Sequence, residues 1–209
     1  MLLWLLGALS LPTVAAANPP LPLEGEDILA SPGLTPEILA LLKDTKEKYG
    51  SDALLLQVQL LHRAIQAGSI LPAGVRVRGV EAEGDHRYLV FYVETGIVYH
   101  TEQTSAGRRL DRVWAEVVVP AVGALTSCDV PGDGIALEIT YAHRSYEDPE
   151  ELARTVVDGP GESERLWVRL LRQDLLAFAR KEIDGRKLFA RSGPRLNGAP
   201  FTDPLPDSP

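Results

Sequence analysis

The spacing of apolar residues changes twice along this chain, and each change marks a different kind of secondary structure. Over residues 35–67 apolar side chains recur at the period of a helix with one buried face. Over residues 75–99 they mostly alternate with polar ones, as in half-buried strands, and the helical period returns over 110–125. The sequence therefore predicts an α+β fold. We expect an N-terminal helical hairpin, then a mostly antiparallel sheet of four to five strands with helices packed on one face.

The boundaries of the helical hairpin are indicated by capping residues. Thr35 is a suitable N-cap, Pro36 fits the first helical position, and Gly50 can end the helix with a positive φ. Asp52 is expected to cap the second helix, which Gly68 closes. The short turn between the two helices predicts that they run antiparallel.

Three further helices are expected. In the apolar stripe over 110–125, Pro120 is expected to kink or split the helix near Val119, because proline lacks the N–H that the helix requires. A short helix is predicted over 149–157 and another over 174–183.

The strands are predicted from alternation and from turn residues. A turn is expected at 83–85, and a two-residue hairpin loop at Thr95-Gly96, which would set Tyr92 opposite Tyr99. The interpretation of 166–171 is open between a strand and the start of a helix, and we favour a strand. The expected strands cover 75–78, 88–93, 97–99, 135–141 and 166–171.

The N-terminus resembles a secretory signal in composition. Residues 2–11 are almost entirely apolar, and the alanines at 15–17 suit cleavage after Ala17, although no Lys or Arg precedes the apolar run. The alternatives are an uncleaved anchor and a misassigned start codon. The predicted organisation is a signal over 1–17, a Pro-rich linker or arm over 18–34, a single domain over 35–192 and a Pro-rich tail over 193–209. The predicted location is the periplasm or the extracellular medium.

Charge and cysteine content narrow the function classes. The formal net charge of −8 disfavours general nucleic-acid binding, because an acidic protein repels phosphate. The many basic residues over 165–195 are interleaved with acidic ones, which predicts a solvated surface rather than a nucleic-acid site. Cys128 is the single cysteine, so the chain forms no internal disulfide. No segment after the signal is long and apolar enough to predict a membrane span.

Two histidines carry the one candidate site. His100 and His143 each extend the apolar face of a predicted strand by one step, so both reach the same rim if the two strands are parallel neighbours. Two imidazoles with Glu102 are the candidate catalytic group, and the same histidines with Asp148 are the candidate metal ligands. The simpler interpretation is two independent histidines whose tips reach water. The loop over 141–148, at a strand end, is the stretch most typical of a functional site.

Standard catalytic and cofactor motifs are absent from the sequence. It contains no Gly-x-Gly-x-x-Gly, no Walker A loop, no Gly-x-Ser-x-Gly and no His-Glu-x-x-His, and no cofactor is predicted. Two hypotheses remain. The favoured one is a non-catalytic binding or accessory protein of the cell envelope or medium, with a possible protein partner in the envelope. The alternative is a hydrolase or metal-dependent enzyme with a His/carboxylate site at the strand rim.

Overall fold

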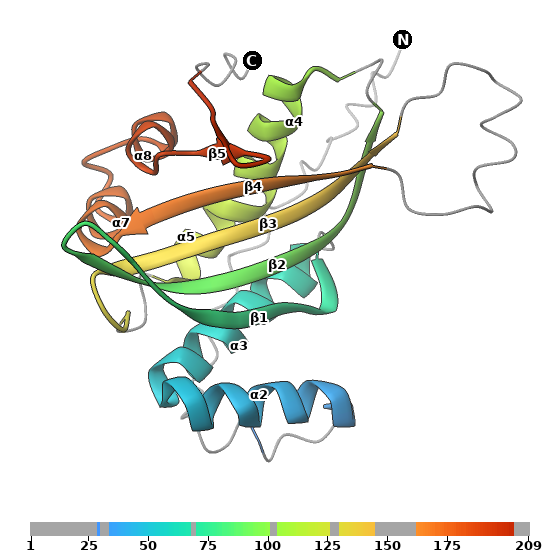
Figure 1. Cartoon of the computed structure of the whole chain (residues 1–209), viewed down its shortest axis with the longest axis vertical. Coiled ribbons are helices and arrows are strands. Elements are labelled where there is room, and N and C mark those ends of the chain that lie inside the picture. Colours follow the sequence, from blue (N-terminus) through green and yellow to red (C-terminus); the bar gives the residue numbers. More distant parts are fainter. Residues whose placement is uncertain are drawn as a thin grey trace, which may run out of the picture.

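The computed structural model describes residue 29 and residues 34–67, 70–100, 104–125, 130–144 and 162–202. Over these ranges the chain has the α+β fold predicted from its hydrophobic periods (Figure 1). Six strands form one mostly antiparallel sheet in which strands consecutive in sequence are neighbours. Two of them are two-residue strands of a C-terminal hairpin, so the four long strands lie within the expected number.

The helical hairpin is confirmed. It consists of α2 (Pro36–Tyr49) and α3 (Ser51–Ala67). The Thr35 hydroxyl accepts a hydrogen bond from the backbone N–H of Ile38 at 3.4 Å, as expected of an N-cap. Gly50 ends the first helix with a φ of 89°, a conformation open mainly to glycine. Helix α3 lies against β1, α2 and α5, and most of its residues between Ala53 and Leu61 are buried.

The sheet begins with an antiparallel hairpin that turns at Gly84, where the turn was predicted. The third strand then pairs with the second in parallel, and the remaining pairs are antiparallel. In Figure 1 the four long strands run side by side, with the helical hairpin beside the first of them. The strands are β1 (Ile70–Glu83), β2 (His86–His100), β3 (Gly134–Arg144), β4 (Glu162–Leu171), β5 (Arg195–Leu196) and β6 (Ala199–Pro200).

A broken helix makes the parallel connection between β2 and β3. It consists of α4 (Ala106–Val113), the π-helical turn η1 (Trp114–Val118) and α5 (Val119–Leu125). The N–H of Val119 bonds to the carbonyl of Trp114, five residues back. The irregular turn ends at Val118, two residues before Pro120, which has no N–H to donate and whose ring crowds the preceding turn. The predicted interruption near Val119 is therefore confirmed.

The predicted two-residue hairpin at Thr95-Gly96 is wrong. β2 continues without a turn from His86 to His100. The Thr95 hydroxyl donates to the carbonyl of Thr140 at 2.9 Å, which ties this part of the strand to β3. The Thr-Gly pair instead marks a register irregularity between Glu94 and Val98, so Tyr92 does not face Tyr99 across a hairpin.

The C-terminal part contains a confirmed strand, a shorter helix and elements that the sequence analysis did not predict. The segment over 166–171 is a strand, part of β4. The predicted helix over 174–183 is α7 (Arg172–Ala179), and a further helix, α8 (Gly185–Arg191), begins where Asp184 accepts a hydrogen bond from the N–H of Lys187. β5 and β6 come from the first part of the predicted tail. The predicted helix over 149–157, residues 1–17 and Cys128 lie outside the described residues.

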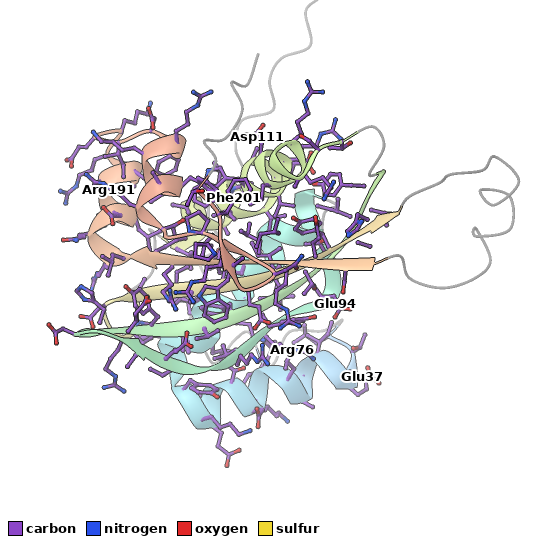
Figure 2. The ribbon with its side chains drawn as sticks, turned by 45° about the horizontal axis from the view of Figure 1, so that its top comes forward. Glu37, Arg76, Glu94, Asp111, Arg191 and Phe201 are labelled. Carbon is purple, nitrogen blue, oxygen red and sulfur yellow. The ribbon has the colours of Figure 1, made fainter. Side chains whose placement is uncertain are left out.

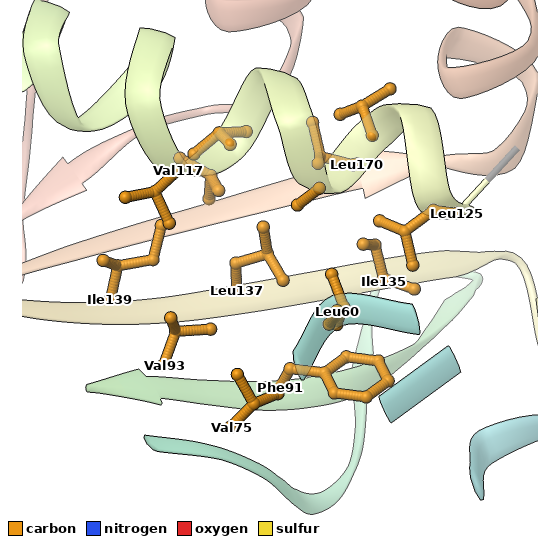
Figure 3. Packing of buried hydrophobic residues seen from close by; sticks show 14 of the residues in the cluster. Leu60, Val75, Phe91, Val93, Val117, Leu125, Ile135, Leu137, Ile139 and Leu170 are labelled. Carbon is orange, nitrogen blue, oxygen red and sulfur yellow. The ribbon is translucent and has the colours of Figure 1, made fainter. Parts of the chain in front are cut away.

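One face of the sheet forms the main hydrophobic core. Alternate residues of β2, β3 and β4 pack against helices α3, α4 and α5 (Figure 3). Phe91, Leu137 and Val168 are fully buried there. On the opposite face lies a smaller apolar cluster, built around Tyr88, Val90 and Ala136, to which no described helix contributes. Among the described residues, the two faces therefore differ in which helices pack against them.

Within the described residues, no helix is long and apolar enough to cross a membrane.

The first prediction concerns Gly134, at the start of β3. A Cβ atom at this position would lie 2.3 Å from the carbonyl oxygen of Leu170 and 3.0 Å from the Cα of Leu171, both backbone atoms of β4. Gly134→Ala is expected to force β3 and β4 apart and to lower the free energy of unfolding by about 2 kcal/mol or more, measured by urea unfolding.

The control is Gly123→Ala in α5, where a Cβ atom would meet nothing within 4 Å. This variant is expected to be neutral or to stabilise the protein by up to about 1 kcal/mol, because alanine favours a helix over glycine. Equal stability of the two variants would contradict the close approach of β3 to β4.

Candidate functional site

A hollow of about 720 Å³ lies on the face of the sheet away from the main core. The side chains at its centre are short, because three small residues, Gly79, Val90 and Ala136, lie next to one another on adjacent strands. Larger side chains rise around them. The charged and aromatic residues that line the hollow are Arg78, Glu81, Glu138, Arg165, Trp167, Arg169 and Arg195.

Glu138 is the fixed charge of this hollow. Glu138 is only 1 % exposed, and each of its two carboxylate oxygens forms an ion pair with an arginine from another strand. Arg78 of β1 bonds to Oε2, and Arg165 of β4 lies with Nη1 3.1 Å from Oε1. The hydrogen bond to Glu138 raises the pKa of Arg78, so this guanidinium stays charged. One buried negative charge is thus held between two largely exposed positive ones.

Trp167 forms the wall next to Glu138. In the strand register it pairs with Glu138 on one side and with Arg195 on the other. The guanidinium of Arg169 lies 5.7 Å from the centre of the Trp167 indole ring. Nη1 of Arg169 also lies 2.7 Å from Oε2 of Glu83. These contacts hold Arg169 in one place. Trp167 is partly buried and packs against the smaller apolar cluster, on the face of the sheet away from the main core.

Arginine and aromatic side chains also meet beyond the hollow. Arg76 of β1 lies with its guanidinium 4.4 Å from the centre of the Tyr92 ring, and Figure 2 labels it on the first strand. The Tyr92 hydroxyl is 3.2 Å from that of Thr140. The row Arg76, Tyr92, Glu138, Trp167 and Arg195 therefore crosses five strands in register.

A second polar cluster lies on the core side. Arg109 of α4 and Glu164 of β4 are both buried and form a two-pronged ion pair, Nε to Oε2 at 2.8 Å and Nη2 to Oε1 at 2.6 Å. The third nitrogen of Arg109 donates to the carbonyl of Thr104 at 2.6 Å. Burial alone would raise the pKa of Glu164, but the hydrogen bonds and charge of Arg109 outweigh it and hold this pKa below its usual value.

Two tyrosines stand beside this pair. Tyr99 and Tyr141 meet edge to face, with ring centres 5.6 Å apart. Burial raises the pKa of Tyr99 to about 12. Burial and the neighbouring Glu164 charge raise that of Tyr141. Both phenols therefore stay protonated at neutral pH, and neither is poised to act as a base.

The structure brings one of the two candidate histidines to this cluster. β2 and β3 are parallel neighbours, as the histidine hypothesis required, but the register pairs Tyr99 with His143 and His100 with Arg144. Neighbouring positions of a strand alternate between faces, so positions 100 and 143 belong to opposite faces of the sheet. Nε2 of His143 lies 4.0 Å from Oε1 of Glu164.

The other two candidates, Glu102 and Asp148, lie outside the described residues, as do residues 145–148 of the loop over 141–148. Across the described part of the chain, no three His, Cys, Asp or Glu side chains are grouped so as to hold a metal ion. The charged partner of His143 is Glu164, a residue that the sequence analysis did not single out.

Compared with protein-family models, with curated proteins and with solved structures, the chain shows no match. The chemistry of the two polar clusters is therefore the basis for any inference about function.

The second prediction concerns the buried ion pair. Glu164→Gln removes the charge that balances Arg109 and is expected to lower the free energy of unfolding by about 3 kcal/mol, because an unpaired buried charge is costly. Replacing both residues, with Arg109→Met and Glu164→Gln, is expected to recover much of this loss. Urea unfolding of the wild type, Glu164→Gln and the double variant measures the free energies of unfolding. Glu182→Gln, at an exposed position, is the control. A double variant no more stable than Glu164→Gln would contradict the pairing.

The third prediction is the pH dependence of the same pair. The pKa of Glu164 is lower in the folded state, so its contribution to stability is complete above the unfolded pKa of about 4.3 and is lost as the pH falls through the folded value. We expect the stability difference between wild type and Glu164→Gln to be constant near neutral pH and to shrink below about pH 4. Urea unfolding over a pH series measures it, and a difference that persists in acid would argue against an ionised Glu164.

Proposed function

We propose that this chain is an exported, non-catalytic binding protein and that its binding site is the arginine-lined hollow on the open face of the sheet. The observation that carries the proposal is Glu138, a buried carboxylate held by Arg78 and Arg165 at the floor of a concave surface. A concave site with a few convergent polar groups is the usual form of a ligand site.

The chemistry of the hollow favours binding over catalysis. Guanidinium groups donate hydrogen bonds and stay protonated, so they hold an acceptor and do not exchange protons with it. Both oxygens of Glu138 are already engaged, which makes it a positioning charge for the two arginines. A fixed array of donors is suited to recognising an anionic or hydrogen-bond-accepting ligand.

Export is supported by the composition of the N-terminus. The apolar run over 2–11 and the small residues at 15–17 are typical of a signal that a peptidase removes. A mature chain beginning at Asn18 would retain every residue that forms the hollow.

The alternative, a hydrolase or metal-dependent enzyme at the strand rim, is favoured by the 4.0 Å approach of His143 to Glu164. The carboxylate of Glu164 is, however, occupied by Arg109 through both oxygens. A metal ion or substrate would have to displace a buried ion pair to use it, so the binding hypothesis is preferred.

The fourth prediction tests both hypotheses with native mass spectrometry of the full chain purified from its own cells. We expect a species heavier than the chain from Asn18, and we expect Arg195→Glu to lose the added mass. Arg195 is chosen because it lines the hollow and is exposed, so that its replacement leaves the fold intact. The matched control, Arg108→Glu on α4, makes the same charge change away from the hollow and is expected to retain the added mass.

Two results would overturn the proposal. A bare chain in every preparation means that no tightly held ligand occupies the hollow. An added mass of one metal ion, kept by Arg195→Glu and lost by His143→Ala, would favour the enzyme at the rim. The mass of the chain itself tests export, since an unprocessed Met1 would contradict cleavage after Ala17.

A further inference from the structure

The hollow continues into a second one. A space of about 790 Å³ lies between β4, helix α8 and the β5–β6 hairpin. Arg169 and Arg195 line both spaces, so they mark the junction of one longer groove. Each space alone is of the size that encloses a small organic ligand, and together they exceed it. A groove of this combined volume has room for an extended chain.

The charge of this groove is opposite to that of the protein. Six arginines and three glutamates line it, an excess of three positive charges in a chain of net charge −8. The charged residues are Arg78, Arg165, Arg169, Arg186, Arg191, Arg195, Glu81, Glu83 and Glu138. All the cations are arginines, whose planar guanidinium binds a carboxylate through two parallel hydrogen bonds.

Arg195 at the junction has a guanidinium with no hydrogen bond or ion pair within the described residues. It is exposed and stands next to Trp167 in the register. Arg169 is held by Glu83 and by the indole of Trp167. The fixed guanidinium of Arg169 and that of Arg195, unpaired among the described residues, therefore both line the junction, where a carboxylate would bind.

The second hollow adds an apolar end to the groove. Tyr88, Leu171, Phe189 and Phe201 line it, beside the two prolines of the β5–β6 hairpin. Figure 2 shows Phe201 near the hairpin and Arg191 on α8. The second hollow also holds four arginines, so the ligand that matches the groove combines carboxylates with an apolar side chain. Interleaved glutamates repel the continuous charge of a phosphate backbone, which favours a peptide over a nucleic acid.

We infer that the groove binds an extended acidic segment of a partner protein, with carboxylates on the arginines and an apolar side chain beside Phe189 and Phe201. This rests on the proposed function and names the class of its ligand. The occupant is a polypeptide because the groove combines both chemistries over two joined hollows.

The fifth prediction is tested with a fluorescein-labelled decapeptide of alternating glutamate and leucine, titrated with the full-length protein by fluorescence anisotropy. We expect saturable binding that Arg195→Glu weakens about tenfold or more, since removing one carboxylate partner and adding a like charge both oppose binding. Arg108→Glu is expected to bind as the wild type does. A peptide with lysine in place of glutamate is expected not to bind.

Several outcomes would overturn this inference. These are equal affinity in Arg195→Glu and Arg108→Glu, no binding of the acidic peptide, or equally tight binding of an oligothymidylate of the same length. Complete displacement by citrate at the concentration of the peptide would assign the groove to a small anion. A dimer in sedimentation that Arg195→Glu dissociates would assign it to a second copy of the chain. In each case an Arg195-dependent added mass in native mass spectrometry would leave the proposed function standing.

Discussion

The parallel pairing of β2 with β3 determines the face on which the later side chains stand. Because β2 runs without a turn to His100, its odd-numbered residues stay on the helix-covered side from Leu89 to Tyr99. The register extends this alternation from β2 to β3 and β4. Glu138 and Trp167 therefore lie on the opposite side of the sheet, away from the main core. A shift of one residue in this pairing would exchange the core and the groove, and the buried apolar set prevents it.

The buried carboxylates of Glu164 and Glu138 differ in how exposed their arginine partners are. Glu164 and its partner Arg109 are both withdrawn from water, so the two charges balance each other and the ion pair joins α4 to β4. Glu138 is equally buried, but its partners Arg78 and Arg165 remain 59 % exposed. Their charges are therefore available to a ligand while their positions are fixed from below. The first arrangement stabilises the fold, and the second prepares a surface.

Local signals in the sequence predicted the helical hairpin, the broken helix before β3, α7 and most of the long strands, while contacts distant in sequence decided the rest. Thr35, Gly50 and Pro120 act on the backbone within a few residues of their own position, so their effects were predictable. Thr95-Gly96 resembles a hairpin loop, but a hydrogen bond to Thr140 keeps the strand extended, and no local pattern reveals that bond. The groove draws on segments between residues 78 and 202, and alternation alone does not say which face the helices leave open. The histidine hypothesis had the correct strand order and failed to bring the pair together on one face, because the missed continuity of β2 shifts position 100.

The local charge of the groove and the net charge of the chain act at different distances. At physiological ionic strength charges are screened beyond about 8 Å, so a partner approaching the acidic surface gains no long-range attraction. Within the groove the arginines lie close enough to touch the ligand, and walls such as Trp167 exclude part of the water that would weaken them. If the groove binds an acidic partner as proposed, that partner would be selected by fit and by slow release rather than by fast association. The net charge of −8 disfavours a nucleic acid, because the charge of its phosphate backbone extends beyond the groove.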